Sequence, residues 1–341
     1  MDTFETEIYL RYKQIIESQK ACTLTCHPGL VPGSPFLSKT EWSSGSALLD
    51  RIQSDSSAVP RLVHMADLLD RYDAFCFDGY GTLYNRGSFV YPGAMEWFKM
   101  LRRAGKQLRL VTNAASDVDE VLARDADKRG FDFTTAETIS SGSLLKDLVV
   151  ELRGHGHELH EVYYIGRETG KHVLEACGIK AVAMDDEPAE PIVAISSAKD
   201  TPETYAQAVK VLQKPGAILL VLNSDAWAPK IPDENGVTSR EPVSGALSEC
   251  LRRDSMSDTN PTGCETYYLG KPFPAIWDKV KRSLPAGSRI LMIGDTLGTD
   301  VFGAKVAGFD SALVVGRNEP VAELKKDELA LGIRPDYYLE S

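Results

Sequence analysis

The sequence contains no long hydrophobic run. None of its apolar stretches approaches the roughly 18 residues that a membrane-spanning helix needs. The N-terminal segment MDTFETEIYLRYKQIIESQ also lacks the basic start and the apolar stretch of a secretory signal peptide. We therefore expect a cytoplasmic protein with no membrane partner.

Basic residues are in short supply as well. There are 38 Lys and Arg against 49 Asp and Glu, which gives a formal net charge of −11. Non-specific binding to nucleic acids or anionic membranes needs clustered positive charge, so we expect neither as a partner. A small anionic substrate is compatible with this balance, because a metal ion and a few basic side chains reverse the sign of the charge locally.

Cysteine is scarce, with six residues in 341. Cys22 and Cys26 are the only close pair, and no second pair stands at zinc-finger spacing. We therefore expect reduced thiols rather than a zinc site. The triplet His155, His157 and His160 has the spacing of metal ligands, but Gly and Glu flank it, so an exposed loop is the simpler interpretation.

The sequence does contain short, almost continuously apolar runs. Each has the length of a β-strand, and helical patterns separate them. Such runs are typical of parallel strands buried on both faces, so an α/β fold with a doubly wound parallel sheet is predicted. The four runs are AFCFD (74–78), QLRLVTN (107–113), RILMIGD (289–295) and SALVVGR (311–317).

The length favours two domains. The predicted parts are an N-terminal helix and irregular extension (1–60), a core domain (61–141 and 264–341) and an α/β domain inserted into it (142–263). Helices are expected at 3–19 and 59–72 from their apolar periodicity. Strands of the inserted domain are expected at VYYIGR (162–167), PIVAISS (191–197) and AILLVLNSD (217–225).

The strongest functional signal follows the first apolar run, in DGYGTLYNRG (78–87). Asp78 ends the strand, and ligands bind beyond the carboxyl ends of strands in an open parallel sheet. A carboxylate in this place suits attack on phosphorus with an aspartyl-phosphate intermediate. Gly81 permits a tight turn, which directs the backbone carbonyl of Tyr80 toward a metal ion. The alternative is that Asp78 only caps the turn.

Three further segments place phosphate-binding and metal-binding groups at strand ends or helix starts. Thr112 offers a hydroxyl and a backbone N–H to phosphate oxygens, or else caps a helix. Lys271 neutralises the nucleophile and the phosphate together, or else lies on the surface. Asp295 and Asp300 form an oxygen-only acidic pair that suits magnesium, or else are a capping and a surface residue. Together the four segments favour phosphoryl transfer.

In this order, Asp78, Thr112, Lys271 and the pair Asp295/Asp300 resemble the four motifs of the haloacid dehalogenase superfamily, over about residues 64–341. The position of the insertion, with GKP and GDTLGTD, is similar to the class IIA branch of p-nitrophenyl-phosphatase-like, phosphoglycolate and pyridoxal phosphatases. The resemblance implies a Rossmann-like core and an α/β cap that closes over the site. It also implies a magnesium-dependent phosphatase for a small phosphorylated metabolite. Caps of this type often support homodimers.

The motifs and the resemblance together define the candidate site. NSDAWAPK (223–230) resembles a segment near the active-site mouth in this branch, although a turn beside a core Trp is the alternative. Arg167 ends a strand of the cap and meets an anionic group, or else is solvated. The candidate catalytic residues are Asp78, Tyr80, Thr112 and Lys271, the metal ligands are Asp78, Tyr80, Asp295 and Asp300, and the substrate-binding residues are Gly79, Asn113, Asn223, Asp225 and Arg167.

Tyr80 departs from the family pattern. Most phosphatases of the superfamily have a second Asp there, which protonates the leaving oxygen and activates water, and its loss typically costs ~10²–10⁴ in rate. Three explanations stay open: a substrate with a good leaving group, a substitute acid from the Tyr80 phenol or the cap, or a regulatory phosphate-binding protein with little or no turnover. Tyrosine here also resembles true haloacid dehalogenases, which need no metal, but those lack the acidic pair and carry their cap elsewhere.

Overall fold

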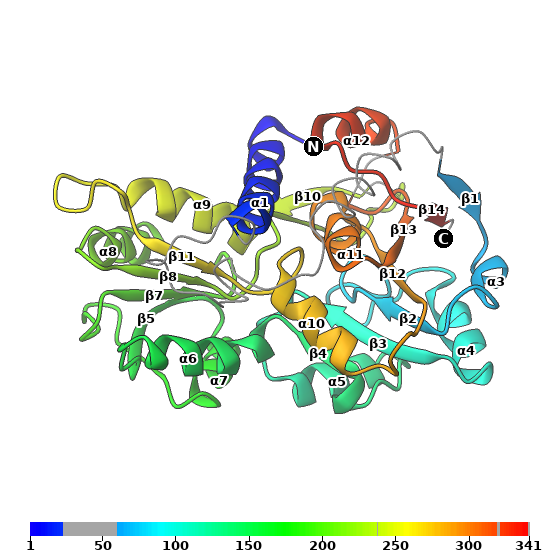
Figure 1. Ribbon diagram of the computed structural model, residues 1–341, viewed down its shortest axis with the longest axis horizontal. Coiled ribbons are helices and arrows are strands. Elements are labelled where there is room, and N and C mark those ends of the chain that lie inside the picture. Colours follow the sequence, from blue (N-terminus) through cyan, green and yellow to red (C-terminus); the bar gives the residue numbers. More distant parts are fainter. Residues whose placement is uncertain (23–59, 237, 319–320, 340–341) are drawn as a thin grey trace.

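The computed structural model describes residues 1–22, 60–236, 238–318 and 321–339. The irregular stretch predicted before residue 60 and the pair Cys22/Cys26 lie outside the side chains that it describes. Two parallel sheets stand beside each other, and helices cover them (Figure 1). In the described ranges, no helix is both long and apolar enough to cross a membrane.

The larger sheet has seven parallel strands in the order β1-β14-β13-β12-β2-β3-β4. From β2 the chain proceeds outward to β3 and β4, and it later returns to β12 and proceeds the other way. The strand order therefore reverses between β2 and β12, where open α/β sheets bind ligands. The strands are β1 (Arg61–Val63), β2 (Ala74–Phe77), β3 (Gln107–Thr112), β4 (Thr138–Ser140), β12 (Ile290–Gly294), β13 (Asp310–Val314) and β14 (Tyr337–Leu339).

Apolar side chains on both faces hold this sheet between helices. In β2, Phe75 and Phe77 pack into one apolar layer and Ala74 and Cys76 into the other, which is why the run reads as continuously apolar. The doubly wound α/β fold predicted from the sequence is confirmed. The helices beside this sheet are α3 (Met65–Leu68), α4 (Ala94–Arg103), α5 (Asp119–Asp127), α10 (Pro274–Arg282), α11 (Phe302–Ala307) and α12 (Leu324–Leu331).

The smaller sheet has five parallel strands in the order β11-β8-β7-β5-β6. Its strands also alternate between two apolar layers: Ile192 and Ala194 of β7 face α6 and α7, whereas Val193 and Ile195 face α8 and α9. The elements are β5 (Glu161–Ile165), β6 (Lys180–Ala181), β7 (Ile192–Ile195), β8 (Ile218–Val221), β11 (Glu265–Tyr268), α6 (Leu145–Gly154), α7 (Lys171–Glu175), α8 (Pro202–Leu212) and α9 (Ser244–Asp254). We refer to this sheet and its helices as the cap.

Helix α1 (Thr3–Cys22) lies between the two halves, beside α9 of the cap and α12 of the core (Figure 1). The hydroxyl of Tyr12 donates to the backbone oxygen of Ser224 at 3.0 Å. Tyr9 packs so closely on Gly298 that a Cβ there would come within 2.3 Å of its ring. The helix predicted at 3–19 is therefore present, and it belongs to an apolar layer shared by both halves.

A short antiparallel hairpin, β9 (Trp227–Pro229) and β10 (Arg240–Pro242), adjoins α1 and the core. Phe4 of α1 packs edge-on against Trp227, with 6.0 Å between ring centroids. Nη1 of Arg240 donates to both carboxylate oxygens of the buried Glu5, at 3.0 and 2.9 Å.

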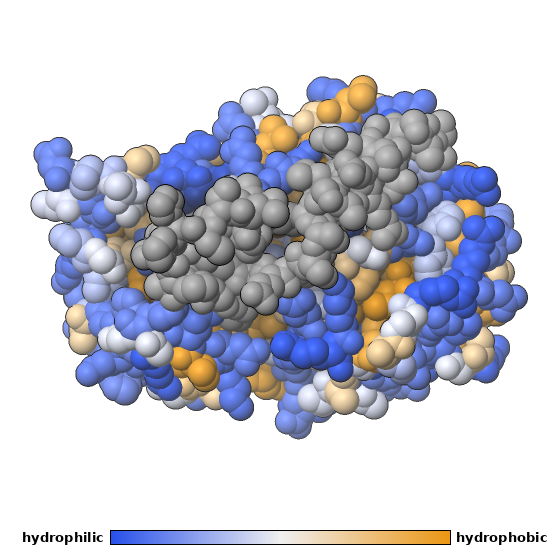
Figure 2. Space-filling view, in the orientation of Figure 1, coloured by the Kyte–Doolittle hydropathy of each residue, from blue (hydrophilic) through white to orange (hydrophobic). Residues whose placement is uncertain are grey.

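Two sequence-based expectations differ from the structure. The segment 59–72 is not one helix, because residues 61–63 pair with 337–339 as an edge strand and only 65–68 are helical. Strand β11 begins just after the predicted boundary at 263/264, yet it pairs with β8 in the smaller sheet. The division into domains otherwise stays a prediction. The coloured part of the face in Figure 2 is mostly hydrophilic, with separate apolar patches.

Candidate active site

Asp78 and Asp295 stand side by side where the order of the larger sheet reverses. Asp78 follows β2 and Asp295 follows β12, and Phe77 pairs with Ile293 across the two strands. The backbone N–H of Asp78 donates to the oxygen of Ile293 at 2.9 Å. Parallel pairing thus brings together two carboxylates that are far apart in the sequence.

Lys271 joins these carboxylates to a third. Its Nζ donates to Oδ1 of Asp78 at 2.5 Å and to Oδ1 of Asp300 at 2.7 Å. Burial lowers the pKa of the Lys271 ammonium, but the charges of Asp300 and Asp78 raise it more, so its pKa lies above the ordinary value. Lys271 is 1% exposed, which excludes the alternative of a surface lysine.

The carboxylates of Asp78, Asp295 and Asp300 form a compact acidic group. One oxygen from each lies within 4.8 Å of the others, and among the described residues this is the only such group of three or more His, Cys, Asp or Glu. Burial, followed by the charges of Asp300 and Asp78, raises the pKa of Asp295 well above its usual range. Three buried carboxylates against one ammonium leave an excess of negative charge that a divalent cation would neutralise.

One oxygen of this group lacks a partner of its own. Oδ2 of Asp295 is buried and has no hydrogen bond, whereas its Oδ1 accepts from the hydroxyl of Thr82 at 3.3 Å. Oδ2 of Asp300 accepts from the backbone N–H of Asp295 and Thr296, at 3.2 and 3.1 Å. A hard cation prefers such oxygen ligands, so the donor set fits a magnesium-type ion.

Gly81 shapes the turn beside this oxygen. Its φ is +99°, and an added Cβ would lie 2.1 Å from Oδ2 of Asp295. Only glycine combines this conformation with such a close approach. The tight turn predicted after Asp78 is therefore present. The coordination of a metal by the carbonyl of Tyr80 stays a prediction.

Thr112 and Asn113 follow β3, the strand next to β2. Thr112 is buried and lines the cavity described below. Asn113 does not line it. The amide of Asn113 accepts from the backbone N–H of Lys271 at 2.7 Å and donates to Oδ1 of Asp225 at 2.8 Å, to the oxygen of Lys271 at 2.9 Å and to Oγ of Ser224 at 3.3 Å. These contacts hold the lysine and the cap segment in place, so Asn113 acts through its neighbours.

Tyr80 lines the cavity, whereas the neighbouring Gly79 does not. The Tyr80 ring packs edge-on against Tyr84, with 5.2 Å between centroids. The guanidinium of Arg129 lies 4.8 Å from the centroid of the Tyr84 ring. Gly79 has no room for a side chain, because a Cβ would lie 2.7 Å from the Tyr84 hydroxyl. The aromatic pair therefore fills the space beside the nucleophile.

A cavity of about 480 Å³ lies between the larger sheet and the cap. Nine of the candidate residues line it: Asp78, Tyr80, Thr112, Arg167, Asn223, Asp225, Lys271, Asp295 and Asp300. The side chain of Asn223 accepts a hydrogen bond from the backbone N–H of Asp225 at 2.8 Å. Both residues therefore form the Asn/Asp turn that was the alternative interpretation, and they also line the cavity. Burial raises the pKa of Asp225 to about 6, although Lys271 lowers it.

Several other cavity residues were not predicted from the sequence. Ser196 and Ser197 end the run PIVAISS just as Asp78 ends its own run, so their position at the end of a predicted strand is the signal that could have identified them. Arg86 lies within the segment 78–87 that follows Asp78, so its place near the site was also open to prediction, whereas Arg129 carries no comparable signal, because it follows α5 and only the folded chain brings it to the cavity.

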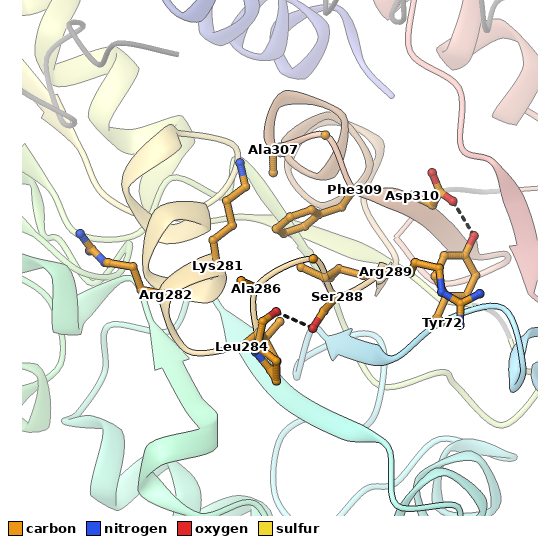
Figure 3. Close-up of a pocket in the computed structure, with 14 residues that line it drawn as sticks. Tyr72, Lys281, Arg282, Leu284, Ala286, Ser288, Arg289, Ala307, Phe309 and Asp310 are labelled. Carbon is orange, nitrogen blue, oxygen red and sulfur yellow. Dashed lines mark hydrogen bonds between the residues drawn. The ribbon is translucent and has the colours of Figure 1, made fainter. Parts of the chain in front are cut away.

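Another hollow, of about 610 Å³, lies between α10 and the starts of β12 and β13 (Figure 3). It is at the opposite ends of the strands from Asp78. Several polar groups on its rim already have partners: the Tyr72 hydroxyl donates to Asp310 at 2.7 Å, and Arg289 pairs with the nearby Asp73 at 2.9 Å. We therefore assign the chemistry to the cavity that contains Asp78.

Family models match two parts of the chain. Residues 75–180 match "Haloacid dehalogenase-like hydrolase", and residues 268–341 match an HAD-hydrolase-like model. Human chronophin is 28% identical to this chain over 291 residues, covering 81% of this chain and 93% of chronophin. The 4-nitrophenylphosphatase of Schizosaccharomyces pombe is 27% identical over 300 residues, covering 81% and 93%.

Solved structures give the same likeness of fold. A possible sugar phosphatase from Cytophaga hutchinsonii superposes with a TM-score of 0.68 at 23% identity, covering 83% of this chain and 98% of the other. A glycerol phosphate phosphatase from Mycobacterium tuberculosis, in complex with magnesium, gives a TM-score of 0.59 at 25% identity, covering 80% and 76%.

Proposed function

This chain belongs to the haloacid dehalogenase-like hydrolases, and we propose that it is a magnesium-dependent phosphatase with Asp78 as its nucleophile. The observation that supports this most strongly is the position of the Lys271 ammonium. It lies 2.5 Å from Asp78 and 2.7 Å from Asp300, inside a cavity large enough for a small ligand. A buried cation beside a buried carboxylate suits a site where a phosphate group has to approach a negatively charged nucleophile.

In the proposed reaction, a carboxylate oxygen of Asp78 attacks phosphorus. The new O–P bond forms as the bond from phosphorus to the leaving oxygen breaks, and the leaving group keeps that electron pair. Burial raises the pKa of Asp78 to about 7, and Lys271 opposes this rise and offsets the charge that builds up. Asp78, Asp295 and Asp300 would hold the magnesium ion, which neutralises phosphate oxygens when it is bound.

The second half of the reaction regenerates the carboxylate. Water attacks phosphorus in the aspartyl phosphate, the bond from phosphorus to Asp78 breaks, and both hydrogens of the water leave with the phosphate as its monoanion. Because Tyr80 replaces the usual acid, the leaving oxygen receives its proton from solvent. Substrates with good leaving groups, such as acyl or aryl phosphates, should therefore react faster than alkyl phosphates.

The substrate is proposed to be a small phosphorylated metabolite. The cavity of about 480 Å³ is within the range of small-molecule sites. The net charge of −11 supports neither nucleic acid nor an anionic membrane as a partner. A homodimer through the cap is a further proposal, to be tested by the mass of the protein in solution.

The function is tested with p-nitrophenyl phosphate and acetyl phosphate, each with magnesium and with EDTA. We expect hydrolysis only with the metal, and a loss of at least about 10³-fold in Asp78→Asn. The exposed Asp258 provides a matched control, since Asp258→Asn makes the same substitution at a residue that does not line the cavity. Lack of magnesium-dependent hydrolysis by the folded protein, or full activity in Asp78→Asn, would refute the proposal.

A further inference from the structure

The cap sheet has a reversal point of its own. From β5 the chain proceeds to β6 on one side and then to β7, β8 and β11 on the other, so the strand order reverses between β5 and β7. In open α/β sheets, ligands bind beyond the carboxyl ends of the strands at this point. The residues there are Arg167, which follows β5, and Ser196 and Ser197, which follow β7.

These residues face the chemistry proposed above. Arg167, Ser196 and Ser197 line the same cavity as Asp78 and Lys271. The carboxyl edge of the cap sheet is therefore directed at the carboxyl edge of the core sheet, with the cavity between them. A substrate whose phosphate lies at Asp78 has to present its other end to the reversal point of the cap.

The backbone of Arg167 is held firmly in this position. Its carbonyl oxygen accepts from the Tyr164 hydroxyl at 3.0 Å and from the backbone N–H of Gly170 at 3.0 Å. The Tyr164 hydroxyl also bonds Oγ of Ser196 at 2.5 Å, which connects the ends of β5 and β7. The close approach depends on Gly166, where a Cβ would lie 2.3 Å from both oxygens.

The side chain of Arg167 is, in contrast, exposed. Nearby charges already have partners, since Glu168 pairs with Lys171 at 2.8 Å and Asp117 with His172 at 3.2 Å. Over the described part of the chain, no carboxylate pairs with the Arg167 guanidinium. In addition, Oγ of Ser197 is buried without a hydrogen-bond partner. The carboxyl edge of the cap sheet thus presents a guanidinium group without a carboxylate partner and a hydroxyl group without a hydrogen-bond partner.

We infer that the substrate carries a second anionic group, a carboxylate or another phosphate, which Arg167 and Ser197 bind at the end remote from the scissile phosphate. This inference rests on the proposed function for the position of the first phosphate. A guanidinium recognises both anions through paired N–H donors, and a serine hydroxyl adds one more donor. An uncharged distal group would leave the guanidinium without a partner.

Three ligands with the same three-carbon chain test this class: propyl phosphate, 3-(phosphonooxy)propanoate and propane-1,3-diyl bisphosphate. Calorimetric titration of the full-length Asp78→Asn protein with magnesium gives their dissociation constants, because this variant should hydrolyse them at least about 10³-fold more slowly. We expect at least one of the two ligands with a second anionic group to bind about 10-fold or more tightly than propyl phosphate, and the stronger one identifies the distal anion.

Arg167→Gln should remove this preference, weakening the distal-anion ligand about 10- to 100-fold more than propyl phosphate. Arg167→Lys should keep part of this preference, since lysine retains the positive charge but lacks the paired N–H donors of the guanidinium. Lys199→Gln removes an exposed cap charge that does not line the cavity, and should keep the preference. The inference is wrong if the Asp78→Asn protein that keeps Arg167 shows no preference, or if adding Arg167→Gln weakens the binding of all three ligands equally. The proposed function is tested separately by the p-nitrophenyl phosphate assay. A negative result there would refute the proposed function without deciding the inference, because the titrations measure binding and not hydrolysis.

Discussion

Replacing Arg240 by alanine measures how much the ion pair with the buried Glu5 contributes to the free energy of unfolding. Glu5 is 0% exposed on α1, and the guanidinium of Arg240 on β10 donates to both its oxygens. Burial raises the pKa of the Glu5 carboxyl from 4.5 to about 7, while Arg240 lowers it. Because the folded-state pKa exceeds the unfolded one, the contribution of Glu5 to stability is complete below pH 4.5 and is lost as pH rises through about 7.

Arg240→Ala raises this pKa further, and its cost should therefore grow with pH. Near pH 6 the carboxyl is mostly protonated in both proteins, and the variant loses about 1 kcal/mol for the hydrogen bonds. Above pH 7, each unit adds up to about 1.4 kcal/mol, as the wild-type protein ionises beside Arg240 and the variant does not. The total near pH 9 reaches about 4 kcal/mol, typical of a broken buried pair.

Urea unfolding at pH 6, 7, 8 and 9, followed by tryptophan fluorescence, measures this difference. The double variant Glu5→Gln/Arg240→Ala should show no such growth, because the titrating group is gone. Lys128→Ala, which breaks an exposed pair with Asp125, should have a small and constant effect. A pH-independent cost for Arg240→Ala, or growth that survives in the double variant, would refute the reasoning.

Three other substitutions test the site. Asp295→Asn should raise the urea midpoint of unfolding in EDTA, because it removes one of three buried carboxylates that repel one another, and it should abolish the stabilisation by magnesium. A lower midpoint in EDTA would show that repulsion among these carboxylates does not destabilise the metal-free protein. Lys271→Met should reduce the turnover of p-nitrophenyl phosphate by roughly 10²–10³-fold, and it should lower the urea midpoint without metal because Asp78 and Asp300 lose their ammonium partner. Unchanged turnover would exclude a role of Lys271 in the reaction. Asn113→Ala should cost about 2–4 kcal/mol in unfolding free energy, because four hydrogen bonds are lost inside the protein, whereas a cost below about 1 kcal/mol would show that water replaces them.

The central strands of the larger sheet were predictable, because burial on both faces makes each a continuous apolar run. Runs at 74–78 and 289–295 end in Asp78 and Asp295, and parallel pairing necessarily brings such ends to one edge. The short strands β1 and β14 were not predictable. Residues 61–63 and 337–339 are too short to carry a periodic pattern, and they are strands because β1 pairs with β14 and β14 pairs with both β1 and β13.

Contacts between distant loops were equally hidden. Asn113 was predicted to bind substrate from its place after a strand, but its amide is occupied by Lys271, Ser224 and Asp225, which arrive from two other segments. No local pattern encodes that meeting. The exposed Arg167 was found because the end of a strand is a local property, whereas Arg129 required the folded chain.

The position of α1 has a consequence for how the cavity fills. The cavity lies between cap and core, and α1 is bonded to both. On the cap side, the hydroxyl of Tyr12 donates to the oxygen of Ser224. On the core side, the amino group of Met1 pairs with Asp327 of α12 at 2.9 Å, and Lys13 donates to the oxygen of Leu331 at 3.1 Å. A separation of cap and core that widened the cavity would therefore have to break one of these sets of contacts, so α1 and the residues before it should oppose such a movement.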